Sequence, residues 1–383
     1  MRTMAEIKSA EPGVTGPACV PESYTFPVTL MGGGARRALG LVSSTASAAG
    51  AAGIEGRVLA VFRRSFYLEM GGGSAGKEGA LVCMGPAWIG PGPLNAICAL
   101  PEGMDWRASG LAEGGRASCW RELLCAGRFS FSCAGAANWR SAPPSLDFDN
   151  APAIRTALEA MARKAGRLAP EEGLGRLIPA LARGEPARCE PDALDRRGGK
   201  DQVMRSGSRG AGALMRWIRE MVRAELSLFE TAPTGLSLSE PPEAAAGLIG
   251  LGPGLTPSGD DFIGGAMIAL RTMGRGREAD RLAAWALPLA ESGTGRISRA
   301  HLECAARGEG AGALHRVMET IPGMSLRTGG DIAASLAAID AVGHTSGWDA
   351  LAGVVGAIAA VCGDFSQYDD REKNGVRDKE QEW

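Results

Sequence analysis

The spacing of apolar residues changes near residue 142, and this change constrains the fold more than any other feature of the chain. Before it, short β-prone runs such as 57–62 and 128–133 are separated by glycine-rich turns, and the second run alternates with period two. After it, apolar residues recur at helical spacing, as Ile154 and Leu158 do. These periods are typical of half-buried strands and of amphipathic helices. The sequence therefore predicts an α+β protein, with an N-terminal β-rich domain followed by a predominantly α-helical C-terminal domain.

The individual elements follow from the same patterns. Strands are predicted at 57–62, 65–70, 80–84, 95–100 and 128–133. One helix rich in Ala and Leu is predicted at 35–52 in the N-terminal part. Further helices are predicted at 151–168, 212–229, 262–270, 299–307 and 350–362.

Local composition divides the chain further. The stretch 138–150 contains Pro143 and Pro144 and is predicted as the linker between the domains. The charged, glycine-rich stretch 185–210 is predicted as a mobile loop or a lid. The predicted units are a loose N-terminus at 1–24, a β-rich domain at 25–142, an α-helical domain at 151–363 that carries the site, and a disordered charged tail at 364–383.

Charge, cysteine content and hydropathy exclude several classes of function. The formal net charge is -2 and no basic cluster is present, which argues against nucleic-acid binding. The nine cysteines form no Cys-x-x-Cys pair, so we expect reduced thiols. No apolar leader segment is visible, and the longest apolar run, 351–362, is shorter than the ~20 residues that span a bilayer. We therefore expect a cytoplasmic protein that does not bind membranes.

The segment 252–261 has the most unusual composition in the chain. It is a glycine- and proline-rich turn that carries hydroxyls and two adjacent carboxylates, Asp260 and Asp261, and it leads into an apolar helix. Free N–H groups at a helix start attract phosphate or carboxylate. Adjacent carboxylates repel such an anion unless Mg²⁺ lies between them or one acts as a general base. The alternative is an ordinary helix cap. The predicted ligand-binding residues here are Gly252, Gly254, Thr256, Ser258 and Gly259.

A second segment, 343–349, also precedes an apolar helix. It contains His344, Thr345, Ser346 and Asp349. His344 and Asp349 are predicted to join Asp260 and Asp261 as catalytic residues, with Thr345 and Ser346 binding the ligand. A capped helix start is again the alternative interpretation.

The two segments share a pattern. Residues 258–265 and 346–353 both read Ser-Gly-x-Asp-x-aliphatic-x-Gly. We hypothesise that two related helix starts face one another across one pocket. Asp261 and Asp349 would then be equivalent acids, and Gly265 and Gly353 would let the two helices pack closely.

A third segment, 294–303, contains two arginines and a serine before a predicted helix. Ser298 is predicted to cap that helix and to contact the ligand. Arg296 and Arg299 are cations that could meet a carboxylate or phosphate. The alternative is a capped helix with solvated charges.

Together these segments resemble a domain-of-unknown-function family whose members include the AllH-type subunit of oxamate carbamoyltransferase. The family pattern Gly-Leu-Gly-x-Gly-Leu-Thr-Pro-Ser-Gly-Asp-Asp is matched at 250–261. A serine before a helix is matched at 298–308, and Gly-His-Thr-Ser-Gly-x-Asp at 343–349. The resemblance extends over about 25–363 and is most specific in the first motif.

The resemblance implies a role in purine-derived nitrogen catabolism, within allantoin degradation. It implies a reaction that interconverts oxalurate plus phosphate with oxamate plus carbamoyl phosphate, and it implies protein partners, because such enzymes need two other kinds of subunit. Two alternatives remain open. The chain could be a non-catalytic subunit that binds a small anion or serves assembly, or a stand-alone kinase or hydrolase of a small carboxylic acid.

Overall fold

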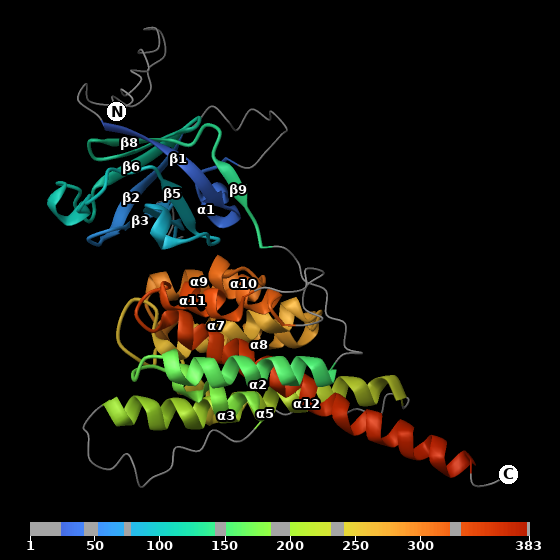
Figure 1. Ribbon diagram of the computed structural model, residues 1–383. Helices are drawn as coiled ribbons and strands as arrows, with labels where there is room; N and C mark the ends of the chain where they lie inside the picture. The colour runs from blue at the N-terminus through green and yellow to red at the C-terminus, as the bar shows by residue number, and fades with distance from the viewer. Residues whose placement is uncertain are drawn as a thin grey trace.

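The computed structural model describes residues 24–41, 53–72, 78–141, 151–184, 200–230, 241–321 and 331–380. They form two parts (Figure 1), a β-sheet part at residues 24–139 and a helical part that follows it. The predicted α+β architecture, with β-structure first and helices second, is therefore confirmed. At 200–203, 226–230 and 364–380 only the backbone is described.

The strands close into a barrel. They are β1 (Tyr24–Gly32), β2 (Ile54–Val61), β3 (Phe66–Met70), β4 (Ala80–Gly85), β5 (Asn95–Cys98), β6 (Arg116–Trp120), β7 (Leu123–Ala126), β8 (Phe129–Ser132) and β9 (Ala137–Trp139). Their order is β5-β4-β3-β2-β6-β7-β8-β1, and β5 pairs back onto β1, while β9 adds to β1 outside the closed ring. Most neighbours are antiparallel, but β1–β8, β4–β5 and β1–β9 are parallel. Closure leaves few free strand edges.

Aromatic side chains fill the barrel interior. Phe66, Trp106, Phe129 and Phe131 are buried there, and the rings of Phe66 and Trp106 meet edge to face with centroids 4.7 Å apart. Such contacts add to the free energy gained from burial of the rings. The few aromatic residues of the chain are thus concentrated where a closed barrel needs large side chains.

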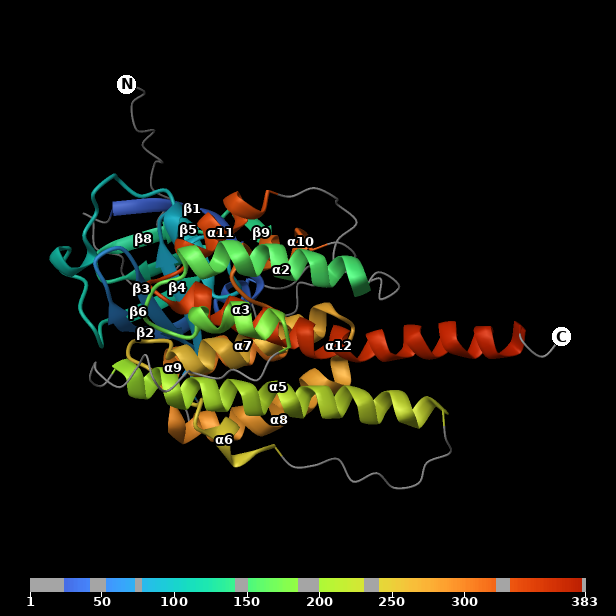
Figure 2. The ribbon, with the colours of Figure 1, turned by 60° about the horizontal axis from the view of Figure 1, so that its bottom comes forward.

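The helical part surrounds two central helices, α7 (Ser258–Thr272) and α12 (Ser346–Glu380). Its other elements are α2 (Ala151–Leu168), α3 (Ile178–Ala182), α5 (Lys200–Glu230), α6 (Glu243–Ala246), α8 (Gly276–Gly293), α9 (Arg296–Ala306), α10 (Gly312–Glu319), α11 (Ile332–Asp340) and the short 3-10 turn η5 (Gly175–Leu177). Helix α7 is buried on almost every face, which explains its uninterrupted apolar run at 262–270. Figure 2 shows α12 running from the centre of the bundle to beyond it.

Helices α7 and α12 pack against each other more extensively than any other pair of described elements. A Cβ on Gly265 would lie 1.9 Å from the carbonyl oxygen of Ala350, and a Cβ on Gly353 would lie 2.0 Å from that of Phe262. Ala350 and Phe262 occupy equivalent positions in the repeated pattern, so each glycine meets the partner helix at the same site. The hypothesis of two related helices packed through these glycines is confirmed.

The barrel rests on α9. Arg296 and Arg299 both pair with Glu78, next to β4, and Arg296 lies 3.7 Å from Glu69 of β3. A small apolar cluster connects the same elements, among them Leu81 of β4 and Cys304 of α9. The two arginines therefore join the domains and are not solvated charges.

Several predicted elements need correction. Of the helix predicted at 35–52, the described residues contain only the six-residue α1 (Gly33–Ala38), and 42–52 lies outside the described residues. Strands β1, β6, β7 and β9 were not predicted.

Residues 200–210, assigned to a loop, form the start of α5, while 185–199 lies outside the described residues. The tail from residue 364, predicted to be disordered, continues α12 to Glu380. The predicted loose N-terminus, 1–24, lies outside the described residues except for Tyr24, which begins β1. The predicted linker, 138–150, begins inside strand β9, and its part at 142–150 lies outside the described residues.

One described helix is long and apolar enough to cross a membrane. It is the stretch Ser346–Gly363 of α12, and 83% of it is buried inside the protein. Its apolar surface is therefore covered by other parts of the fold.

The glycine contact between α7 and α12 gives a first prediction. Gly265→Ala places a methyl group against a backbone carbonyl that cannot move without shifting α12, so we expect it to lower the free energy of unfolding by about 1–3 kcal/mol. Denaturant unfolding measures this loss. The neighbouring Gly264→Ala is the control, because its Cβ would lie 3.5 Å from Ala305, an ordinary contact. Equal stability of the two variants would contradict the prediction.

Candidate functional site

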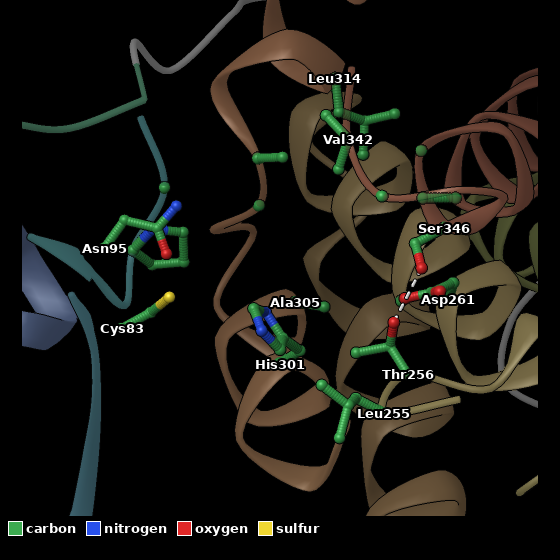
Figure 3. Close-up of a pocket in the computed structure, with 18 of the residues that line it drawn as sticks. Cys83, Asn95, Leu255, Thr256, Asp261, His301, Ala305, Leu314, Val342 and Ser346 are labelled. Atoms are coloured by element: carbon green, nitrogen blue, oxygen red, sulfur yellow. Dashed lines mark hydrogen bonds between the residues drawn. The ribbon is translucent and has the colours of Figure 1, made fainter. Parts of the chain in front are cut away.

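A cavity of about 330 Å³ lies between the barrel and the helical part. The barrel contributes Cys83 and Asn95, and the helical part contributes Asp261 and His301, among others (Figure 3). Tyr67 of the barrel also lines the cavity. Such a volume is at the lower end of the range for small-molecule sites. The cavity depends on the docking of the two parts, because neither supplies its wall alone.

Asp261 lines this cavity from the first turn of α7. The hydroxyls of Thr256 and Ser346 lie beside it, 2.8 Å from each other (Figure 3). Burial raises the pKa of Asp261 well above its ordinary value, and the nearby Asp349 raises it further, although both hydroxyls oppose the change. Its Oδ2 is buried and has no hydrogen-bond partner among the described residues. The protonated acid is therefore favoured, and it has hydrogen-bonding capacity that the protein leaves unused.

Asp260 also lines the cavity, but protein donors occupy its carboxylate. The backbone N–H of Gly250 donates to Oδ1 at 2.9 Å. The hydroxyl of Ser298 donates to Oδ2 at 2.7 Å, and that of Thr294 donates to the same oxygen. Asp260 thus ties the loop before α7 to the start of α9. Ser298 lies inside the first turn of α9, which begins at Arg296, so the predicted cap is wrong.

Asp349 takes the equivalent position on α12 and is fully buried. The backbone N–H of Leu174 donates to its Oδ1. Burial raises the pKa of Asp349, and the hydroxyl of Ser258 is the largest opposing influence. Each acid therefore lies beside the serine that begins the other helix, Asp261 beside Ser346 and Asp349 beside Ser258. The two helix starts do face one another, but of the equivalent acids Asp261 and Asp349 only Asp261 lines the cavity.

Three residues of the wall had no role in the sequence prediction. The Tyr67 hydroxyl lies 3.4 Å from Nε2 of His301, and burial lowers the pKa of His301 to about 4. Burial also raises the pKa of the Cys83 thiol to about 12 and moves that of Tyr67 upward. All three are neutral near neutral pH. The only available signal was the position of His301 inside the third segment.

The cavity wall is poor in positive charge. Among the described residues that line it, none is Lys or Arg, and the acids Asp260, Asp261 and Glu309 are present. Apolar side chains such as Leu314 and Val342 form much of the remaining surface. An anion therefore has no fixed cation in this wall, and binding must depend on hydrogen bonds.

The other predicted ligand-binding residues lie at or behind the helix starts. A Cβ on Gly252 would lie 3.0 Å from the backbone nitrogen of Ser258, and one on Gly259 would lie 1.9 Å from the carbonyl oxygen of Leu248. The Gly259 amide donates to Leu251. These glycines serve close packing. No side chain caps α7, so the simple capping interpretation is not supported.

His344 does not line the cavity. Its side chain is 79% exposed, and its Nε2 lies 3.4 Å from Glu172. Thr345 is beside Asp349 and does not line the cavity. The structure therefore brings together Thr256, Asp261, Ser346, Asp260 and Ser298, and places His344, Thr345 and Asp349 outside the cavity wall.

A magnesium ion at Asp260 and Asp261 stays a prediction that the donor set does not favour. Asp260 is engaged by three donors, and burial favours protonated Asp261. Within the described residues, no three His, Cys, Asp or Glu side chains gather as a metal site. We therefore derive no step through a metal.

The raised pKa of Asp261 gives a second prediction. The folded protein holds this proton more tightly than the unfolded chain, so the stability that Asp261 contributes is complete below its ordinary pKa of 3.8 and is lost as the pH rises. Asp261→Asn stays uncharged, so we expect its stability relative to the parent to increase with pH. Urea unfolding between pH ~4 and ~8 measures this.

Asp280→Asn controls for the loss of one negative charge, because Asp280 is 70% exposed on α8. A stability difference between Asp261→Asn and the parent that is constant across this pH range would disprove a raised pKa.

One comparison with known proteins gives a match, and it lies in the helical part of the chain. Residues 248–358 match the family model described as "Oxamate carbamoyltransferase subunit AllH". Neither the curated proteins nor the solved structures give a significant match. The matched segment begins just before the turn at 252–261 and ends within α12, so it contains Asp261, Ser346 and the α7–α12 contact. Residues 248–358 of the chain are therefore similar to the AllH-type family of oxamate carbamoyltransferase subunits.

Proposed function

We propose that this chain is a subunit of an oxamate carbamoyltransferase-like enzyme and that the cavity beside Asp261 is its substrate site. The reaction would interconvert oxalurate plus phosphate with oxamate plus carbamoyl phosphate, in cytoplasmic breakdown of purine-derived nitrogen. The observation that carries the proposal is the overlap of the family match with the cavity. Thr256, Asp261 and Ser346 all come from the matched segment and meet at one point.

The residues suit one part of this chemistry. A phosphate oxygen attacks the ureido carbonyl of oxalurate, the carbon–nitrogen bond breaks, and the leaving nitrogen takes its electron pair and a proton. A carboxylic acid with a raised pKa, such as Asp261, can donate that proton and regain one from the attacking phosphate. The proton count is then balanced, and the acid returns to its starting form. Neutral His301 and Tyr67 can orient the substrate by hydrogen bonds.

The carboxylate end of oxamate or oxalurate could bind at the mouth of the cavity. The backbone amides of Gly254 and Leu255 make no backbone hydrogen bond within the described residues, and Leu255 lines the cavity. Successive free amides in a turn can hold an anion without a charged side chain. This supports the predicted small anionic substrate in its carboxylate form.

One observation favours a second candidate, a subunit that binds the substrate without turning it over. Carbamoyl transfer develops charge on phosphate, which enzymes stabilise with cations or preorganised donors. The described wall has no Lys or Arg. Catalysis would then depend on groups from the other subunits, while this chain holds the acceptor.

Turnover by the assembled complex distinguishes these candidates. If Asp261 transfers the proton, Asp261→Asn should lower phosphate-dependent cleavage of oxalurate by roughly 10²–10⁴-fold, the usual contribution of a general acid. The complex carrying Asp280→Asn is the matched control. Full activity of Asp261→Asn in the complex would remove Asp261 from the chemistry and favour the binding role. Absence of this reaction in a complex with all its subunits would refute the proposed function itself.

A further inference from the structure

The two related helix starts differ in what covers their acids. The backbone of residues 173–175 covers Asp349. The N–H of Leu174 donates to Oδ1 of Asp349, and the N–H of Gly175 also contributes to its environment. Gly173 has φ +81°, and a Cβ there would lie 2.5 Å from Oδ1. A peptide group of the chain is therefore fitted closely onto this acid.

Over Asp261 lies the cavity instead. The reciprocal contacts of Gly265 and Gly353 show that α7 and α12 are related in place as well as in sequence. Each acid also has the serine of the opposite helix beside it. The main difference is that a peptide amide of the chain covers Asp349, whereas the space over Asp261 is open to a small molecule.

We propose that Asp261, with Ser346 beside it, is a recognition site for a primary amide or carbamoyl group, and that the amide of the ligand takes the place that the backbone at 173–175 takes over Asp349. This inference deepens the proposed function and rests on it, because it places the amide end of the substrate in the same cavity.

The chemistry of the two groups is complementary. An un-ionised carboxyl presents an O–H donor beside a carbonyl acceptor, and a primary amide presents an acceptor beside N–H donors, so the two form a pair of hydrogen bonds. A buried pair of this kind discriminates strongly against a ligand that lacks one partner, because an unpaired buried polar group is costly. Burial of Asp261 favours the un-ionised form that this pairing requires.

The same wall is unsuited to phosphate. Phosphate recognition relies on Arg, Lys or several directed amides, and no Lys or Arg lines the described cavity. Asp260, whose oxygens already accept from protein donors, adds negative charge nearby. This chain therefore holds the amide-bearing acceptor, and the phosphate group is bound by another subunit of the complex.

Isothermal titration of the full-length chain with oxamate, oxalate and inorganic phosphate tests the inference. Oxalate has a second carboxylate in place of the amide of oxamate and is otherwise alike. We expect oxamate to bind at least tenfold more tightly than oxalate, and phosphate not to bind. Asp261→Asn keeps one donor beside one acceptor and should retain oxamate binding. Asp261→Ala should weaken it at least tenfold, whereas Asp280→Ala should not.

The comparison of oxamate with oxalate uses the parent protein, so the test does not depend on the folding of a variant. Equal affinity for the two ligands would overturn the inference, as would unchanged oxamate binding by Asp261→Ala. Binding of phosphate as tight as that of oxamate would overturn the assignment of phosphate to another subunit. If the isolated chain binds no oxamate while the assembled complex turns over oxalurate, the inference fails and the proposed function stands.

Discussion

The close contact between α7 and α12 is the constraint on which the rest of the structure depends. Glycine at 265 and at 353 lets the two backbones approach until a carbonyl oxygen of each helix occupies the space of a side chain on the other. This approach brings the two helix starts together and buries the carboxyls that follow them. The burial of the two acids and the placing of a serine beside each are consequences of one backbone-to-backbone contact, and the barrel docked on α9 completes the cavity.

Burial at the contact between α7 and α12 also determines how a motif with two acids, Asp260 and Asp261, can lie beside an anionic ligand. Two adjacent carboxylates next to an anionic ligand require either a cation or a proton. The structure separates the two acids by environment, because Asp260 accepts from Gly250, Thr294 and Ser298, whereas Asp261 is desolvated next to Asp349. Three donors hold the carboxyl group of Asp260, whereas the low polarity around Asp261 favours its neutral form. Burial of Asp261 therefore favours the proton over the cation at this position.

The sequence predicted those helices and strands whose pattern of apolar residues is visible within the element itself. The helix at Ala151–Leu168 has a clear apolar stripe, and its predicted ends agree with the structure. The α7–α12 pairing was also accessible, because the same glycine recurs at the same place in a repeated pattern. Strand β6 was missed because its inward residues, Ala117 and Cys119, are small and carry little strand preference. Tyr67 and His301 could not be found, because they meet only when the barrel docks on α9. The exposure of His344 likewise depends on tertiary placement.

Comparison of the two similar helix starts, of α7 and α12, gives a reason for the buried Asp261 in the cavity. Burial of this acid lowers the stability of the free protein. Over Asp349 the chain supplies its own amide at Leu174, and that carboxyl is a fixed structural element. Over Asp261 no backbone amide takes the equivalent place. Its Oδ2, like Oδ2 of Asp349, is buried without a hydrogen bond among the described residues, but of the two acids only Asp261 lines the cavity. An unsatisfied buried group destabilises the free protein, and a ligand that satisfies it recovers that free energy on binding. The two helix starts therefore differ in that the chain itself covers Asp349 during folding, whereas the space over Asp261 stays open to a ligand.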